Sequence, residues 1–489
     1  MRAAAAAFAF AFAFTCLAHS AGLAQGTVPR HGVLELSFVH TGTVGNPHAA
    51  LSATASFRSP AGRTHEIPLF WDGGAAWKVR FSPDATGTWR WSTRSGNPGL
   101  NGRSGSFTCG ASGLQGGIVT MPGSPYHFQR QSGRPFWWQG ETQWILFGNL
   151  PGENLTRATT LNFLDRRSAQ GFNVIHAALD TPYGGSAVDG RGTPNPDYFR
   201  EVDLRVAHAN GRGITVGLVL AWGTRWKAYP SDAARLRYAR YVAARYAAYN
   251  VYFVVANEWR DGLSASQVRA IGSELQQSDP HERLIANHSF GPSKADGPVG
   301  DEGSVEQFAE QPWMGFGDYQ QLYDRLHQRI LVARDHSKPV VNAEYGYFLR
   351  DQDGDGHVDK NNSFTLDHVR FASWDIAMAG GYFVTGFATT YLGGIRDEGP
   401  FDPQASANRP WEEDARLIRR LFDTLGWLDW WKLKPSDGML SATAGRASDE
   451  VVSNPDGWFF APPPRTHWAL AEVGRQYVAY LRGNAGAHQ

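Results

Sequence analysis

The sequence lacks several features that would point to particular classes of protein. It has no excess charge of one sign, because 46 Lys and Arg residues balance 46 Asp and Glu residues. Binders of nucleic acid or anionic membranes need a basic surplus, so we expect neither partner. We find no P-loop, dinucleotide glycine fingerprint, zinc spacing or Gly-x-Ser-x-Gly motif. These absences argue against redox cofactors and serine-hydrolase chemistry.

Long apolar runs are absent after the first two dozen residues. Residues 3–17 form an apolar stretch that follows Arg2 and precedes small and polar residues up to Ala24. This pattern is typical of a secretory signal peptide, and the run is too short for a comfortable transmembrane helix. We therefore expect cleavage after Ala24 and a secreted or periplasmic bacterial protein. Of the two cysteines, only Cys109 would remain, so a large core rather than a disulfide must stabilise the fold.

Residues 27–115 have the pattern of an antiparallel β-sandwich. Short alternating runs occur at 33–38, 51–57, 76–81 and 87–92, with turn-forming Gly, Pro, Asn and Asp between them. These runs carry no clustered acids or bases. We interpret this N-terminal domain as a structural or sugar-binding module attached to an enzyme.

Residues 116–457 alternate between strand-like and helical patterns, which predicts an α/β fold of the (β/α)8 TIM barrel type. The predicted strands are 136–145, 173–178, 214–221, 251–256, 283–287, 305–310, 339–343 and 381–387. The predicted helices are 161–170, 198–210, 233–249, 264–277, 318–336 and 366–378, with a final helix at 411–428. Residues 458–489 resemble a short β-segment, too small to be stable alone, which we expect to pack on the barrel.

Two glutamates follow matched strands of this predicted barrel. Glu258 comes directly after the fourth strand and after Asn257, and Glu344 ends the seventh strand directly before Tyr345. A single glutamate at a strand end is more often a helix cap or an ion-pair partner. Two carboxylates across the mouth of a barrel are what glycoside hydrolysis requires. We expect Asn257 to bind a sugar hydroxyl and Tyr345 to orient Glu344.

Two segments of the predicted barrel resemble the opening of the apiosidase-like glycoside hydrolase family. They are 133–144 (GRPFWWQGETQW) and 166–175 (RRSAQGFNVI). The N-terminal domain resembles the DUF5060-type β-sandwich that commonly precedes this family, through 69–73 (LFWDG) and 79–89 (VRFSPDATGTW). By analogy with retaining barrel glycosidases, the resemblance implies that Glu258 is the acid/base and Glu344 the nucleophile. Glu141 departs from the family pattern, which has Asp there, and this departure bears on sugar specificity.

Other strand ends supply aromatic and polar side chains that could bind sugars, since aromatic faces stack on the C–H faces of sugar rings. Each aromatic could equally be a core residue. The candidates are Glu141, Trp144, Asp180, Tyr183, Trp222, His288, Trp313 and Tyr391.

An acidic run after the seventh strand resembles a calcium loop. Asp351, Asp353 and Asp355 occupy positions 1, 3 and 5, Gly356 occupies position 6, and Asp359 follows. Position 12 is Asn362 rather than the usual Glu. The run is either a structural Ca²⁺ site or a solvated acidic turn, and no cofactor is expected for the chemistry itself.

The sequence therefore predicts a secreted, retaining glycoside hydrolase acting on a poly- or oligosaccharide. Two alternatives stay open: a transglycosylase on the same barrel, and a non-catalytic carbohydrate-binding protein that has kept the fold. Keeping both Glu258 and Glu344 argues against the second alternative. The sugar, the anomer and the choice between exo and endo action do not follow from the sequence.

Overall fold

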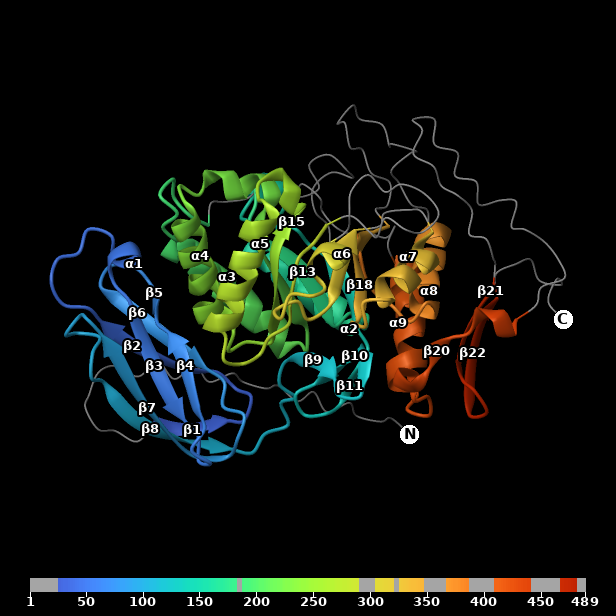
Figure 1. Cartoon of the computed structure of the whole chain (residues 1–489), viewed down its shortest axis with the longest axis horizontal. Helices are drawn as coiled ribbons and strands as arrows, with labels where there is room; N and C mark the ends of the chain where they lie inside the picture. Colours follow the sequence, from blue (N-terminus) through green and yellow to red (C-terminus); the bar gives the residue numbers. More distant parts are fainter. Residues whose placement is uncertain are drawn as a thin grey trace.

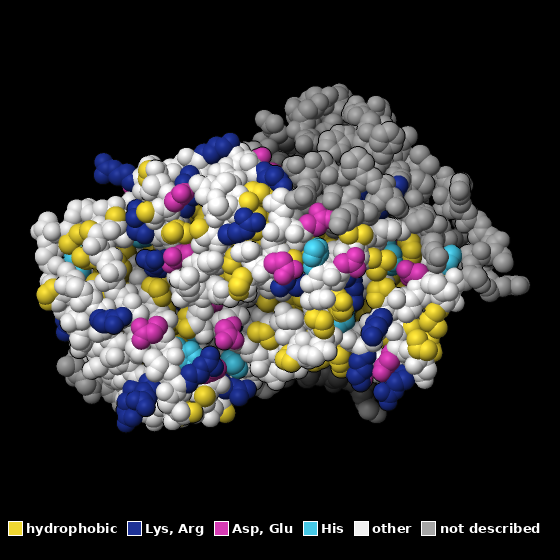
Figure 2. All heavy atoms as spheres, viewed as in Figure 1, with side chains coloured by type: hydrophobic (Ala, Val, Ile, Leu, Met, Phe, Trp, Pro, Cys, Tyr) yellow, Lys and Arg dark blue, Asp and Glu magenta, His cyan; other side chains and the backbone are white. Residues whose placement is uncertain are grey.

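The computed structural model describes residues 25–182, 187–289, 304–320, 325–346, 366–386, 409–440 and 467–481. Figure 1 shows an N-terminal β-domain in blue, a central α/β region in green and yellow, and a small red sheet near the C-terminus. In the face seen in Figure 2, Lys and Arg side chains are interspersed with Asp and Glu, in keeping with the zero net charge. No helix in these ranges is long and apolar enough to span a membrane.

The N-terminal domain consists of two antiparallel-rich sheets around one core. One sheet has the order β1-β8-β7-β3-β4 and the other β2-β6-β5. Their bounds are β1 Gln25–Pro29, β2 Leu34–Val39, β3 Ala53–Arg58, β4 Thr64–Pro68, β5 Phe70–Trp71, β6 Ala76–Phe81, β7 Gly87–Ser95 and β8 Ser104–Gly110, with helix α1 Pro47–Ala50. Phe57 and Phe81 stack at 4.2 Å between the sheets. The four alternating runs expected from the sequence are all strands.

The central sheet consists of eight parallel strands in the order β16-β15-β14-β13-β12-β19-β18-β17. Their bounds are β12 Gln139–Thr142, β13 Val174–Asp180, β14 Thr215–Trp222, β15 Val251–Asn257, β16 Ile285–Ala286, β17 Gly317–Gln320, β18 Val340–Tyr345 and β19 Tyr382–Thr385. The edges β16 and β17 meet through backbone hydrogen bonds from Gly315 to Ile285, 2.8 Å, and from Gln320 to Ser289, 2.7 Å. The sheet therefore closes into the expected TIM barrel.

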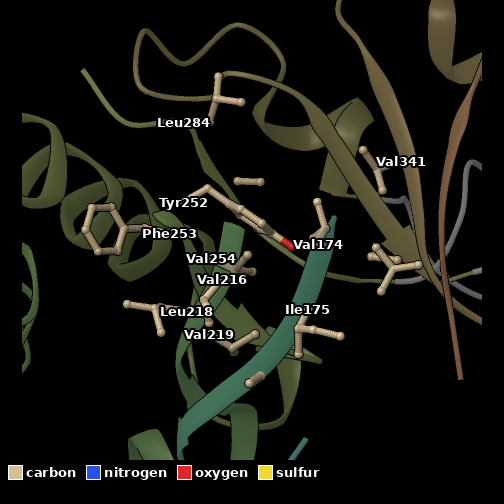
Figure 3. Packing of buried hydrophobic residues seen from close by; sticks show 14 of the residues in the cluster. Val174, Ile175, Val216, Leu218, Val219, Tyr252, Phe253, Val254, Leu284 and Val341 are labelled. Carbon is tan, nitrogen blue, oxygen red and sulfur yellow. The ribbon is translucent and has the colours of Figure 1, made fainter. Parts of the chain in front are cut away.

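Strand residues alternate between the barrel interior and the surrounding helices. In Figure 3 Tyr252 and its neighbour Phe253 point to opposite sides of β15, and the Tyr252 ring extends toward Val174 on β13. Gly217 on β14 leaves room for this ring, since a Cβ there would lie 2.2 Å from the Tyr252 hydroxyl oxygen. The interior is thus filled by side chains and forms a core.

Helices α2, α3, α4 and α5 begin at capping residues. Thr156, Asn195, Ser231 and Ser264 each accept a backbone hydrogen bond at the start of a helix, which satisfies an otherwise unpaired N–H group. The helices are α2 Arg157–Ala169, α3 Pro196–Gly211, α4 Asp232–Tyr246, α5 Ala265–Ser278, α6 Ser304–Phe308, α7 Leu326–Arg334, α8 Leu366–Met378 and α9 Arg409–Arg419.

The sixth unit of the barrel differs from the sequence prediction. The expected strand 305–310 is occupied by helix α6, in which Val305 and Phe308 share one buried face. The sixth strand is instead β17, Gly317–Gln320, which lies partly in the range expected to be the helix 318–336. Short apolar runs do not distinguish helix from strand, and β17 carries the polar residues Asp318 and Gln320. The prediction of this unit was therefore wrong.

The C-terminal sheet packs on the outside of the barrel, as expected. It consists of β20 Lys434–Pro435, β21 His467–Glu472 and β22 Gln476–Leu481. Trp468 on β21 donates its indole N–H to Asp375 of α8 at 2.7 Å. Tyr480 on β22 stacks on Trp374 of α8 at 5.0 Å. These contacts supply the partner surface that three short strands need.

A buried ionic network joins the N-terminal domain to the barrel. Asp203 of α3 accepts hydrogen bonds of 2.9 Å from both Arg80 of β6 and Arg245 of α4. Arg245 also donates to Asp72, next to β5, at 2.9 Å. Burial would raise the pKa of Asp203, but the two guanidinium groups outweigh it and hold the pKa well below its usual range. Asp203 is therefore the shared anion of the domain contact.

We predict that Asp203→Asn lowers the free energy of unfolding by about 3–5 kcal/mol, because it leaves two buried guanidinium groups without their shared anion. Chemical denaturation measures this loss. Asp197→Asn is the matched control on the same helix, where the side chain is 88% exposed, and it should change stability by less than about 0.5 kcal/mol. Equal effects of the two substitutions would contradict the role given to Asp203.

Candidate active site

Two glutamates meet at the end of the barrel where the strands finish. Glu344 lies in β18 and is buried, while Glu258 directly follows β15 and is partly buried. Burial raises the pKa of Glu258 to about 7, and the negative charge of nearby Glu344 contributes to the rise. Active sites of TIM barrels lie at this end of the strands. The structure therefore brings together the two carboxylates singled out in the sequence.

The backbone at Glu258 adopts a conformation that is uncommon for residues other than glycine. Its φ of 47° and ψ of 53° lie in the left-handed region. The turn is held by close backbone packing, because a Cβ on Gly223 would lie 2.1 Å from the Glu258 carbonyl oxygen. A Cβ on Gly262 would likewise lie 1.8 Å from the carbonyl oxygen of Gly223. Both glycines are needed for the close approach that fixes Glu258, and such strain is concentrated at functional sites.

His288 lies between two carboxylates beneath the site. Its Nδ1 is 2.7 Å from Asp318 Oδ1, and its Nε2 is 3.2 Å from Glu344 Oε2. Burial would lower the pKa of the imidazole, but the charges and hydrogen bonds of Asp318 and Glu344 outweigh burial and raise the pKa to about 10. His288 thus contacts Glu344 directly, and both its ring nitrogens are engaged by protein, so its assignment to the sugar site is corrected.

Aromatic rings pack against one another beside the two glutamates. The Trp144 ring lies 5.3 Å from Trp222, 5.1 Å from His176 and 5.9 Å from His288. A hydrogen bond from the Trp222 side chain to Glu258 partly offsets the rise in the pKa of Glu258. Trp222 therefore lies beside Glu258, while Trp144 is fully buried behind it, and a role for either ring in sugar binding stays a prediction.

Asn257 and Asp180 also lie at strand ends near the mouth of the barrel. The Asn257 side-chain oxygen is buried and has no hydrogen-bond partner in the described part of the chain. Asp180 accepts hydrogen bonds from Arg225, 3.0 Å, and Tyr229, 3.2 Å, which belong to the loop after β14. The Asn257 oxygen is thus left unpaired within these residues, whereas the Asp180 oxygens hold the loop.

Two of the expected site residues point into the helix layer instead. Glu141 forms an ion pair with Arg167 of α2, with one contact of 3.2 Å. The Tyr345 hydroxyl contacts Ser373 of α8 at 2.5 Å, so Tyr345 does not orient Glu344. Neighbours in a strand face opposite sides, and Glu344 already faces the interior. The assignments of Glu141 and Tyr345 to the sugar site are corrected accordingly.

Trp313 is a packing residue on the outside of the barrel. It precedes β17, whereas the prediction placed it after the sixth strand. A Cβ on Gly272 of α5 would lie 2.3 Å from its ring, so the indole packs directly on this helix. Because the sixth strand was predicted too early in the chain, Trp313 was wrongly expected at the mouth of the barrel. Its assignment to the site is corrected. Tyr183, Tyr391, Asp351, Asp353, Asp355 and Asp359 lie outside the described residues.

The sequence analysis missed Asp318 and His176. Asp318 fell within a predicted helix, so its interior position on β17 was hidden. His176 lies in the correctly predicted strand β13, where a polar residue within an apolar run was the available signal. Its Nδ1 is 2.9 Å from the Tyr252 hydroxyl, and burial lowers its pKa to about 4.

His176, His288 and Asp318 offer ligand atoms that lie within 4.8 Å of one another. This spacing alone would allow a metal ion. His288, however, uses both nitrogens in hydrogen bonds with carboxylates, whereas a metal-ligating imidazole must be neutral with one bare nitrogen. The set therefore fits a hydrogen-bonded cluster better than a metal centre.

Comparison with solved structures supports the barrel fold. A candidate glycoside hydrolase from Bacteroides vulgatus ATCC 8482 is 19% identical, with a TM-score of 0.67 and coverage of 82% of this chain and 79% of that one. A glycoside hydrolase family 5 structure from the same organism is 17% identical, with a TM-score of 0.54 and coverage of 73% and 78%. At these identities the likeness shows the fold. No curated protein matches the sequence.

Comparison with protein families gives two matches. A domain of unknown function, DUF5060, matches residues 27–96 in the N-terminal β-domain. The family described as "Apiosidase-like, catalytic domain" matches residues 124–416, which is more than half of the chain and spans both Glu258 and Glu344. The chain therefore belongs to the apiosidase-like family, and it is a glycoside hydrolase.

Proposed function

We propose that this enzyme cleaves a poly- or oligosaccharide by double displacement with retention of anomeric configuration, using Glu344 as nucleophile and Glu258 as acid/base. One observation carries the proposal: the two carboxylates share a site but have opposite surroundings. Burial and the charge of Glu344 keep a proton on Glu258 near neutral pH. Glu344 instead faces the imidazole of His288, which favours its negative charge.

The chemistry proceeds in two steps on these residues. In the first, a Glu344 oxygen attacks the anomeric carbon while Glu258 gives its proton to the leaving glycosidic oxygen, which departs with the bond's electron pair. In the second, Glu258 takes a proton from water, the water oxygen attacks the anomeric carbon, and Glu344 is released. The Asn257 oxygen would accept a hydrogen bond from a sugar hydroxyl, and Trp144 and Trp222 would provide apolar surface.

We also propose that the enzyme acts outside the cytoplasm of its bacterium. The support is the pattern of residues 1–24, in which a short apolar run follows Arg2 and small residues precede the expected cleavage point. Polymeric glycans do not cross the cytoplasmic membrane, so export would bring the enzyme to its substrate.

We predict that the mature protein releases a sugar from at least one member of a panel of pectic, hemicellulosic and microbial glycans. Glu344→Gln should reduce this release by about a thousandfold or more, because the amide is not a nucleophile. Chromatographic product analysis measures it. Glu66→Gln, at an exposed position on β4, is the control and should retain full activity. Equal activity of Glu344→Gln and the wild type would refute the assignment, and transfer of the sugar to another sugar would indicate a transglycosylase.

The pH dependence should identify the acid. Glu258 must be protonated to assist the leaving group, so kcat/KM should fall as pH rises through the Glu258 pKa of about 7. Initial rates on the identified substrate, measured from pH 5 to 9, report this alkaline limb. Glu258→Gln should lose both the limb and most of the rate. An unchanged limb in that variant would exclude Glu258 as the acid.

A further inference from the structure

We propose that Asp318 is a positioning residue of the reaction, which acts through His288 to hold Glu344 oriented and negatively charged. The inference rests on the function proposed above, because that function makes Glu344 the nucleophile. It is carried by a line of three fully or nearly fully buried side chains from β17, the segment after β16, and β18.

With both carboxyl groups ionised, the geometry fits two protons on His288. A carboxylate oxygen faces each ring nitrogen, at 2.7 Å on the Asp318 side and 3.2 Å on the Glu344 side. A neutral imidazole has a single N–H, so it would turn a nitrogen lone pair toward one of the two carboxylates. Only the doubly protonated ring donates to both. The arrangement therefore assigns a positive charge to His288.

Asp318 is the partner that stabilises the positive charge of His288. Its carboxylate is fully buried. Within the described part of the chain, His288 is the one cationic group that forms an ion pair with it. Its second oxygen, Oδ2, has no hydrogen-bond partner there. An unpaired buried carboxylate is very costly, so Asp318 and the imidazolium stabilise each other. Asp318 also fixes the ring orientation that aims Nε2 at Glu344.

The other titratable groups around the cluster do not take over this role. His176 on β13 lies 5.9 Å from His288, and burial keeps it neutral by lowering its pKa to about 4. Its Nδ1 contacts the Tyr252 hydroxyl, which is also uncharged, since burial raises the pKa of Tyr252 well above its ordinary value. Glu258, on the β15 side, holds a proton up to about pH 7. None of these three groups adds positive charge beside Glu344.

The charge state of His288 tests the inference without any substrate. In ¹⁵N-histidine NMR of the whole mature protein, His288→Gln assigns the His288 signal among those of the other histidines. We expect His288 of the wild type to carry both protons from pH 6 to about pH 9, given its pKa of about 10. In Asp318→Asn, which removes the buried charge, it should lose one proton at least two pH units lower. A neutral His288 in the wild type at pH 7, or identical titration in both proteins, would overturn the inference.

Kinetics on the substrate found in the glycan panel provide the second readout. Asp318→Asn should lower kcat by about tenfold while KM changes less than twofold, since a charge-assisted hydrogen bond to Glu344 is weakened. Because Asp318 acts through His288, the double variant with His288→Gln should be no slower than His288→Gln alone. If the reductions in kcat of the two single variants multiplied in the double variant, Asp318 would not act through His288.

Asp165→Asn is the matched control. Asp165 pairs with a different histidine, His208, at 2.6 Å near the surface, and its loss should leave both readouts unchanged. If Asp318→Asn does not fold, the wild-type titration still decides. If no glycan is cleaved by the wild type, the proposed function fails while the titration remains an independent test of the Asp318 and His288 contact.

Discussion

The proposed mechanism requires that two carboxylates in one partly dehydrated site carry different charges. Placed near each other, they favour a state in which one is protonated, and the surroundings decide which one. On the Glu258 side the structure supplies burial and the nearby charge of Glu344, which together outweigh the hydrogen bond from Trp222 and raise the pKa. On the Glu344 side it supplies a histidine held by a buried aspartate. The two sides of the barrel mouth thus favour opposite protonation states of their glutamates.

The rest of the molecule holds the different surroundings of Glu258 and Glu344 in place. The core below the site is filled from several strands, with the Tyr252 ring lying over Gly217 of the adjacent strand β14 and extending toward Val174. The loops after β14 and β15 touch through Gly223 and Gly262, so Glu258 has little freedom to move. Farther from the site, the ion pairs of Asp203 with Arg80 and Arg245 join the N-terminal domain to helices α3 and α4. A rigid scaffold is what an active site of fixed geometry requires.

Much of this architecture was readable from the sequence because buried parallel strands are apolar runs with polar residues at their ends. The strands β13, β14, β15 and β18 were located within about two residues, and Glu258 and Glu344 with them. The first strand was predicted too long, since 135–136 belong to a separate small sheet as β11. What a linear pattern lacks is the direction of each side chain. Glu141 and Tyr345 follow the right strands but face helices.

The residues behind Glu344 were harder to predict than the two glutamates, for a physical reason. Strand β17 contains the polar residues Asp318 and Gln320, so it does not have the apolar composition that marks the other strands. Asp318, which contacts His288, is therefore one of the residues that hid this strand. The nearby helix α6, with two apolar residues on one face, was taken for the strand instead.

The anomeric configuration of the first product, followed by ¹H NMR immediately after mixing enzyme and substrate, tests the division of roles between Glu344 and Glu258 most directly. A double displacement through a glycosyl-enzyme on Glu344 inverts the anomeric carbon twice, so the account predicts a first product with the configuration of the substrate. A first product of opposite configuration would mean that water attacks directly. In that case Glu344 would serve as a base, which would contradict the account.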